Sequence, residues 1–122
     1  GGDHTQPLAF IDEAVRSKCR IVAPDLRAHG SCTLDESPSL LTFQQLAVDV
    51  DAAIGPSHGP PVLVGISMGA GVALELVARG TPGISALVLV RPAWLWEPNP
   101  ANLAAFPRIA TLLRERGVGV PC

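Results

Sequence analysis

The segment that most restricts the fold of this chain is Gly65-Ile66-Ser67-Met68-Gly69. The apolar run at residues 61–65 predicts a buried strand, and residues 68–79 have the apolar spacing of a helix. The chain must therefore turn sharply at the serine. We expect the serine backbone to be strained there, with glycines at 65 and 69 because side chains at these positions would clash with neighbouring backbone.

Two segments earlier in the chain predict helices. In residues 41–54, Thr42 and Gln45 have the spacing of a capping box, and apolar side chains follow at helical intervals. Residues 7–17 carry apolar side chains at three- and four-residue steps, which is typical of an amphipathic helix with one buried face.

Two short apolar runs, residues 19–23 and 84–90, are rich in β-branched side chains and end at or near a proline. Such runs are typical of buried parallel strands. With the strand at 61–65 they give the order strand, helix, strand, helix, strand, which indicates a parallel sheet joined by right-handed crossovers. We therefore predict an α/β fold, with a mostly parallel sheet between two helix layers.

The composition favours one folded domain, because 48% of the 122 residues are hydrophobic and only 16% are charged. Residues 1–91 form the expected core portion, which contains the serine turn. In residues 92–122 tryptophans and prolines interrupt regular structure, and one short helix is expected near 108–116. This second part reads as the start of a subregion that the chain does not finish.

Several classes of function are disfavoured by the charge and the motifs. The net charge is −2 and the basic residues are scattered, so we expect no nucleic-acid or membrane partner. Three cysteines without C-x-x-C spacing indicate neither a disulfide framework nor a zinc site. No nucleotide-binding glycine motif, signal segment or membrane span is visible. We expect a cytoplasmic protein that acts on a small molecule without a metal or cofactor.

The serine turn suggests acyl-transfer chemistry. Ser67 is the candidate nucleophile, and the backbone N–H of Met68 at the start of the helix could stabilise a developing oxyanion. Gly65, Ile66 and Gly69 would complete the nucleophile turn. The alternative is that Ser67 is an ordinary helix N-cap, a position that serine favours.

Three stretches together, residues 23–31, 65–69 and 86–92, resemble an α/β-hydrolase of the esterase and haloperoxidase-like type. The resemblance covers most of the chain and implies part of the α/β-hydrolase fold, truncated before its end. In that family the first loop reads Asp-x-x-Gly-His-Gly-x-Ser, whereas this chain has Ala28 at the first glycine position. The resemblance implies that His29 stabilises this loop rather than acting as the catalytic base.

The same resemblance assigns further candidate residues. Residues 1–4 resemble the end of the loop that provides the second oxyanion donor, which makes Gly2 a candidate. Residues 92–122 would begin a lid, in which Trp94, Leu95 and Phe106 could line an acyl pocket; ordinary packing under a loop is the alternative.

The catalytic acid and base cannot be identified in the sequence. The family places both after the serine, where the chain has no histidine and only three carboxylates: Glu75, Glu97 and Glu115. We predict a serine hydrolase for an ester, thioester or related carbonyl substrate, acting through an acyl-enzyme at Ser67 and needing the remainder of the fold as a partner. The alternatives are an inactive fragment or binding module, or a non-hydrolytic relative such as a cofactor-free haloperoxidase.

Overall fold

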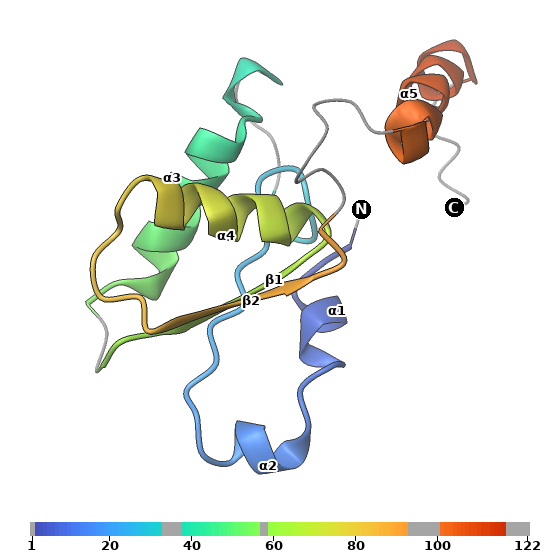
Figure 1. Ribbon diagram of the computed structural model, residues 1–122. Helices are drawn as coiled ribbons and strands as arrows, with labels where there is room; N and C mark the ends of the chain where they lie inside the picture. The colour runs from blue at the N-terminus through green and yellow to red at the C-terminus, as the bar shows by residue number, and fades with distance from the viewer. Residues whose placement is uncertain (1, 33–37, 57–58, 93–100, 117–122) are drawn as a thin grey trace.

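The computed structural model describes residues 2–32, 38–56, 59–92 and 101–116. The chain forms short helices at its N-terminal end, a small helix–sheet unit in the middle and a separate helix at the C-terminal end (Figure 1). Its elements follow the order α1 (Thr5–Leu8), α2 (Glu13–Arg16), η1 (Pro38–Leu40), α3 (Phe43–Ile54), β1 (Val62–Ile66), α4 (Met68–Ala78), β2 (Ala86–Val90), η2 (Ala101–Ala104) and α5 (Ala105–Arg116).

The central unit is a parallel pair of strands connected by a helix. Strands β1 and β2 pair from Val62 opposite Ala86 to Ile66 opposite Val90, and α4 forms the crossover between them. Helix α4 packs on both strands and α3 packs on α4, so both helices lie on the same side of the sheet (Figure 1). The predicted α/β class, with a parallel sheet and flanking helices, is confirmed, although the sheet described has only two strands.

The core lies between α3, α4 and β1. Leu76 of α4 is its largest fully buried side chain and contacts a cluster with Leu46 and Leu63, from α3 and β1. Ala70 and Ala47 have no exposed surface, and these small side chains let the helices approach their neighbours closely. The sheet and two helices are thus held by one apolar contact zone.

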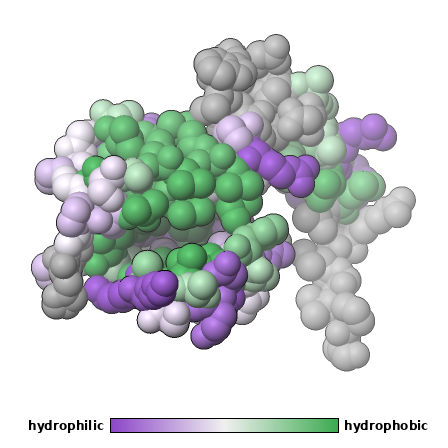
Figure 2. Space-filling model, turned by 60° about the horizontal axis from the view of Figure 1, so that its bottom comes forward, coloured by the Kyte–Doolittle hydropathy of each residue, from purple (hydrophilic) through white to green (hydrophobic). Residues whose placement is uncertain are grey.

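The other face of the sheet is largely uncovered. Val62 and Val64 are each 55% exposed and Val88 is 45% exposed, while Leu63 between the first two is buried. Figure 2, which looks at the molecule from the side away from α4, shows a continuous hydrophobic surface. The expectation that β1 and β2 are buried on both faces is therefore wrong for the residues described, because α3 and α4 cover one face only.

The N-terminal region differs from the prediction. Instead of one helix at 7–17, two one-turn helices form, because the Asp12 carboxylate accepts the Val15 N–H at 3.0 Å and starts α2 as an N-cap. The Arg16 side chain donates to the carbonyl oxygens of Leu8 and Ile11 and binds the end of α1 to α2. Neither helix buries a residue, so the buried face expected for residues 7–17 is not present.

Residues 19–23 do not form the predicted strand. They belong to neither β1 nor β2, and Val22 is 41% exposed. A β-branched run becomes a strand only where a neighbouring strand supplies ladder hydrogen bonds, and no strand in the described part pairs with it.

The remaining helices agree better with the sequence. Helix α3 begins after Thr42, whose hydroxyl accepts the Gln45 N–H at 3.2 Å as expected for a cap. The Gln45 side chain binds Asp49 instead of reaching back to close a capping box. Helix α5 starts three residues before the predicted segment and packs against η2. Within the described ranges no helix is long and apolar enough to cross a bilayer.

Candidate active site

Ser67 occupies a strained turn between β1 and α4. It is the single residue between Ile66, which ends the strand, and Met68, which begins the helix. Its backbone has φ 53° and ψ −113°, a conformation that costs a non-glycine residue about 1–3 kcal/mol. The Ser67 N–H donates to the Val90 carbonyl of β2 at 2.9 Å, which extends the ladder past the last paired strand residue.

The Ser67 side chain does not act as a helix cap. Its hydroxyl makes no capping hydrogen bond, and the residue is exposed. A serine that served only as an N-cap would have extended backbone and would accept an N–H of the first turn, as Asp12 does for α2. The geometry therefore disfavours the N-cap alternative and leaves the hydroxyl open to solvent.

The two glycines of the motif have different surroundings. A Cβ at Gly65 would lie 2.6 Å from the Ala70 Cα and 2.7 Å from the Gly69 carbonyl carbon, so β1 and the first turn of α4 meet there with no space for a side chain. A Cβ at Gly69 would meet nothing within 4 Å. The predicted clash is confirmed at Gly65 and wrong at Gly69, where a side chain would have open space.

Met68 is the first residue of α4. The first N–H groups of a helix have no acceptor within it, and they lie at the positive end of the helix dipole. The Met68 N–H therefore belongs to the residue directly after Ser67, at the start of α4. Its role as an oxyanion donor remains a proposal.

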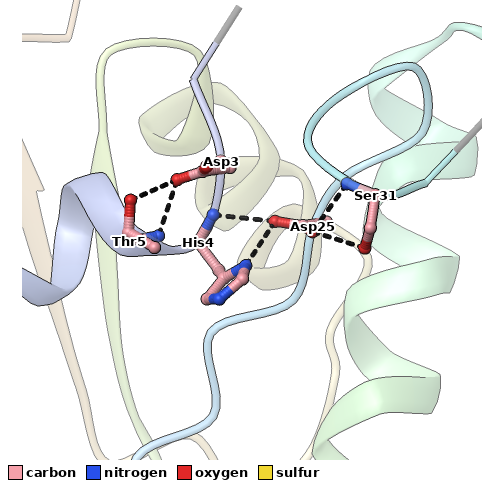
Figure 3. A network of polar contacts seen from close by, with 5 residues as sticks. All are labelled: Asp3, His4, Thr5, Asp25 and Ser31. Atoms are coloured by element: carbon pink, nitrogen blue, oxygen red, sulfur yellow. Dashed lines mark hydrogen bonds and ion pairs between the residues drawn. The ribbon is translucent and has the colours of Figure 1, made fainter.

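The loop after residue 24 is closed around one carboxylate (Figure 3). Oδ2 of Asp25 accepts the backbone N–H of Ser31 at 2.9 Å and its hydroxyl at 2.8 Å. Oδ1 accepts the backbone N–H of His4 at 2.7 Å and contacts His4 Nδ1 at 2.8 Å. These bonds, first from Ser31 and then from His4, hold the pKa of Asp25 well below its usual range.

A second contact attaches the loop to the helix layer. Arg27 donates from Nε and Nη2 to the two carboxylate oxygens of Asp49 on α3, the second bond at 2.9 Å. This two-pronged arrangement fits the planar guanidinium and lowers the pKa of Asp49. The loop is thus bound on one side to the N-terminal segment and on the other to α3.

The loop backbone explains the residue types at 28–30. Ala28 has φ 59° and Gly30 has φ 54°, so both are in the left-handed region. A Cβ at Gly30 would lie 2.5 Å from Asp25 Oδ2, which requires glycine, whereas Ala28 adopts a conformation that favours glycine. His29 Nδ1 contacts the Arg27 carbonyl at 2.8 Å, an interaction within the loop.

The other candidate residues are not brought to Ser67 by the part of the chain described. Phe106 is 64% exposed on α5, and Glu115 lies exposed on the same helix. Glu75 lies within α4. Trp94, Leu95, Glu97 and His58 are outside the described residues. No hydrogen bond joins the Ser67 hydroxyl to a described histidine or carboxylate, so the acid and base remain unidentified.

Sequence reasoning missed the contact between Asp25 and His4. The two residues are 21 positions apart, and the family resemblance places them in two separate loops. The signal in the sequence is Asp25 with Gly30 and Ser31 five and six residues later, because residues of these types favour a loop that folds back on its own carboxylate.

The sequence of this chain is similar to proteins of a known family. A model of the alpha/beta hydrolase family matches residues 1–121. In an alignment of length 97 that covers 74% of this chain, the sequence is 36% identical to protein phosphatase methylesterase 1 of Rattus norvegicus and 35% identical to that of Homo sapiens. The corresponding protein of Bos taurus is 32% identical over the same length.

The match covers 25% of the length of each of these relatives, so the chain spans about a quarter of the curated proteins it resembles. No solved structure gives a significant match.

Proposed function

Because the chain belongs to the alpha/beta hydrolase family, we propose that it supplies the nucleophile of a hydrolase that cleaves carboxylic esters through an acyl-enzyme at Ser67. The observation that carries this proposal is the Ser67 backbone at φ 53° and ψ −113°, between a strand and a helix and with an exposed hydroxyl. Such strain persists only where the surrounding structure enforces it, and it commonly serves function.

The proposed reaction begins with attack of Ser67 Oγ on the ester carbonyl carbon, while a general base takes the hydroxyl proton. The carbonyl oxygen becomes an oxyanion, which the Met68 N–H and a donor from the segment at Gly2 would stabilise. Collapse of the tetrahedral intermediate breaks the bond to the alcohol, which leaves with the proton from the base. Water then hydrolyses the acyl-serine by the same steps. The base and its orienting acid are not among the residues assigned.

The relatives narrow the proposed substrate class. They are named as methylesterases, which favours an ester with a small alcohol leaving group over a thioester or other carbonyl compound. An exposed serine at the start of a helix leaves space for a large acyl part outside the turn. We therefore propose methyl esters as the first substrates to test.

A binding module without activity is the second candidate. The observation that favours it is the uncovered valine face of β1 and β2, because such a surface is suited to contact with another polypeptide. A non-hydrolytic reaction on the same scaffold would still use the Ser67 turn.

The test uses the whole 122-residue chain and a fluorophosphonate probe, which reacts with activated serines. Because the base is not assigned within this chain, we expect slow labelling, supported by the oxyanion donors, that is lost in Ser67→Ala and kept in Ser17→Ala, a control whose hydroxyl donates to the Ala14 carbonyl. Hydrolysis of methyl, ethyl and thioester forms of one acyl group should then rank the methyl ester first. A folded chain, shown by circular dichroism, with equal labelling of all three proteins would contradict the proposal.

A further inference from the structure

We infer that Asp25 is a positioning residue for residues 2–4, the segment proposed to supply the second oxyanion donor. Its carboxylate holds this segment in one conformation and so sets the position of its backbone relative to the Ser67 turn. This inference rests on the proposed function of Ser67. It assigns a role to an acidic residue that the reaction steps themselves do not use.

The first support is the number of donors around one carboxylate. His4 presents its backbone N–H and its ring Nδ1 to Oδ1, and Ser31 presents its N–H and hydroxyl to Oδ2 (Figure 3). The Asp25 side chain is only 9% exposed, whereas the His4 side chain is 47% exposed. The nearly enclosed carboxylate is therefore the fixed part, and the N-terminal segment is attached to it.

The second support is the protonation state that these contacts require. An ionised carboxylate can only accept hydrogen bonds, and the pKa of Asp25 is held low by the donors from Ser31 and His4. The Nδ1 of His4 must therefore carry the proton in this contact. The ring is fixed in one tautomer and orientation by the carboxylate.

The third support is that the Asp25 loop is itself anchored. Two residues further on, Arg27 binds Asp49 of α3, and α3 packs on α4, which begins directly after Ser67. In Figure 1 the N-terminal segment lies toward the end of the sheet where β1 finishes and α4 starts. A continuous set of contacts thus leads from the backbone of residues 2–4 to the helix layer that carries the nucleophile turn.

The loop backbone packs closely against the Asp25 carboxylate. A side chain at Gly30 would lie 2.5–2.6 Å from the Asp25 oxygens. Asparagine at position 25 would have nearly the same shape, but its NH₂ group would face two N–H or O–H donors, so one pair of contacts would become repulsive. The four contacts of the Asp25 carboxylate with His4 and Ser31 are called the clamp. The substitution Asp25→Asn therefore disrupts the clamp without creating a cavity.

The first experiment measures the clamp independently of activity. In the full chain labelled with ¹⁵N, we expect His4 at neutral pH to carry its proton on Nδ1, and we expect Asp25→Asn to abolish this signature. Amide exchange at His4 should become at least about tenfold faster, with the Ser67 amide unchanged. The matched control is Asp12→Asn, which changes the same group at the cap of α2 and should leave His4 as in the parent. Unchanged His4 exchange in Asp25→Asn would overturn the inference.

The second experiment separates positioning from mere stability. We expect the maximal rate of fluorophosphonate labelling to fall at least about tenfold in Asp25→Asn, with the half-saturating probe concentration unchanged. His4→Ala should show a smaller loss that His4→Asn restores, because the asparagine amide can donate in place of Nδ1. If the His4 amide loses its protection from exchange in Asp25→Asn but the labelling rate stays normal, the positioning role of Asp25 is refuted. Asp25 then only stabilises the segment. A parent chain without labelling would instead refute the proposed function, while the exchange data would still decide whether the clamp exists.

Discussion

Replacing Gly65 by alanine places a methyl group where β1 meets the first turn of α4. The new Cβ would lie 2.6 Å from the Ala70 Cα and 2.7 Å from the Gly69 carbonyl carbon, and would also contact the Gly69 carbonyl oxygen. Ordinary carbon contacts need about 3.5 Å or more, so the helix start would have to move by about 1 Å. These atoms belong to backbone and cannot rotate away as a side chain would.

The expected loss of stability is at the upper end of the range for overpacking, about 3 kcal/mol. For a chain of this length that corresponds to a fall in Tm of about 10–15 °C. Gly65 does not have a positive φ, so the effect is steric and not a change in backbone preference. The displacement also moves Ser67, and fluorophosphonate labelling should fall with stability.

Gly69→Ala is the matched control, since it makes the same chemical change four residues later. A Cβ at this position meets nothing within 4 Å, and alanine is the better helix former, so stability should stay equal or rise by up to about 1 kcal/mol. Urea unfolding followed by circular dichroism compares the free energies of unfolding of the three proteins. Equal losses in both variants, or a Gly65→Ala protein within about 0.5 kcal/mol of the parent, would refute the reasoning.

Three further outcomes are expected. Ser67→Gly should abolish labelling but raise the free energy of unfolding by about 1 kcal/mol, because glycine relieves the strain at φ 53°; lower stability would contradict this. Ala28→Gly should raise the Tm through relief of about 0.5–1 kcal/mol at φ 59°, and a lower Tm would show that Ala28 is not strained. The pKa of Asp25 is lower in the folded chain than its ordinary value, so its carboxylate stabilises the fold at neutral pH, and this contribution is lost as the pH falls from about 4 toward the folded pKa. Acid unfolding curves of Asp25→Asn should therefore be flatter below about pH 4 than those of the parent.

The central unit could be predicted because its signals are local. Thr42 caps α3 through its own hydroxyl, and the apolar runs of β1, α4 and β2 are bounded by residues that end them. Ser67 could be recognised for the same reason, since the strand and helix that strain it are its immediate neighbours.

The predictions that are wrong concern features that are not set by the immediate sequence alone. Residues 19–23 have strand propensity, but a ladder needs a partner that sequence does not specify. In the helix predicted at residues 7–17, Asp12 lies on the polar face. In the structure its side chain instead caps the start of α2. The motif alone cannot distinguish Gly65 from Gly69, since the distinction depends on how closely α4 approaches β1.

The hydrogen bond from the Ser67 N–H to the Val90 carbonyl has a mechanical consequence. Arg91, the residue after Val90, also has a positive φ, 49°, so a strained residue directly follows each of the two paired strands. A change in the Ser67 backbone would move its N–H away from the Val90 carbonyl. The turn is therefore a joint that spans the ends of both strands, and the pairing with β2 helps to fix the conformation of Ser67.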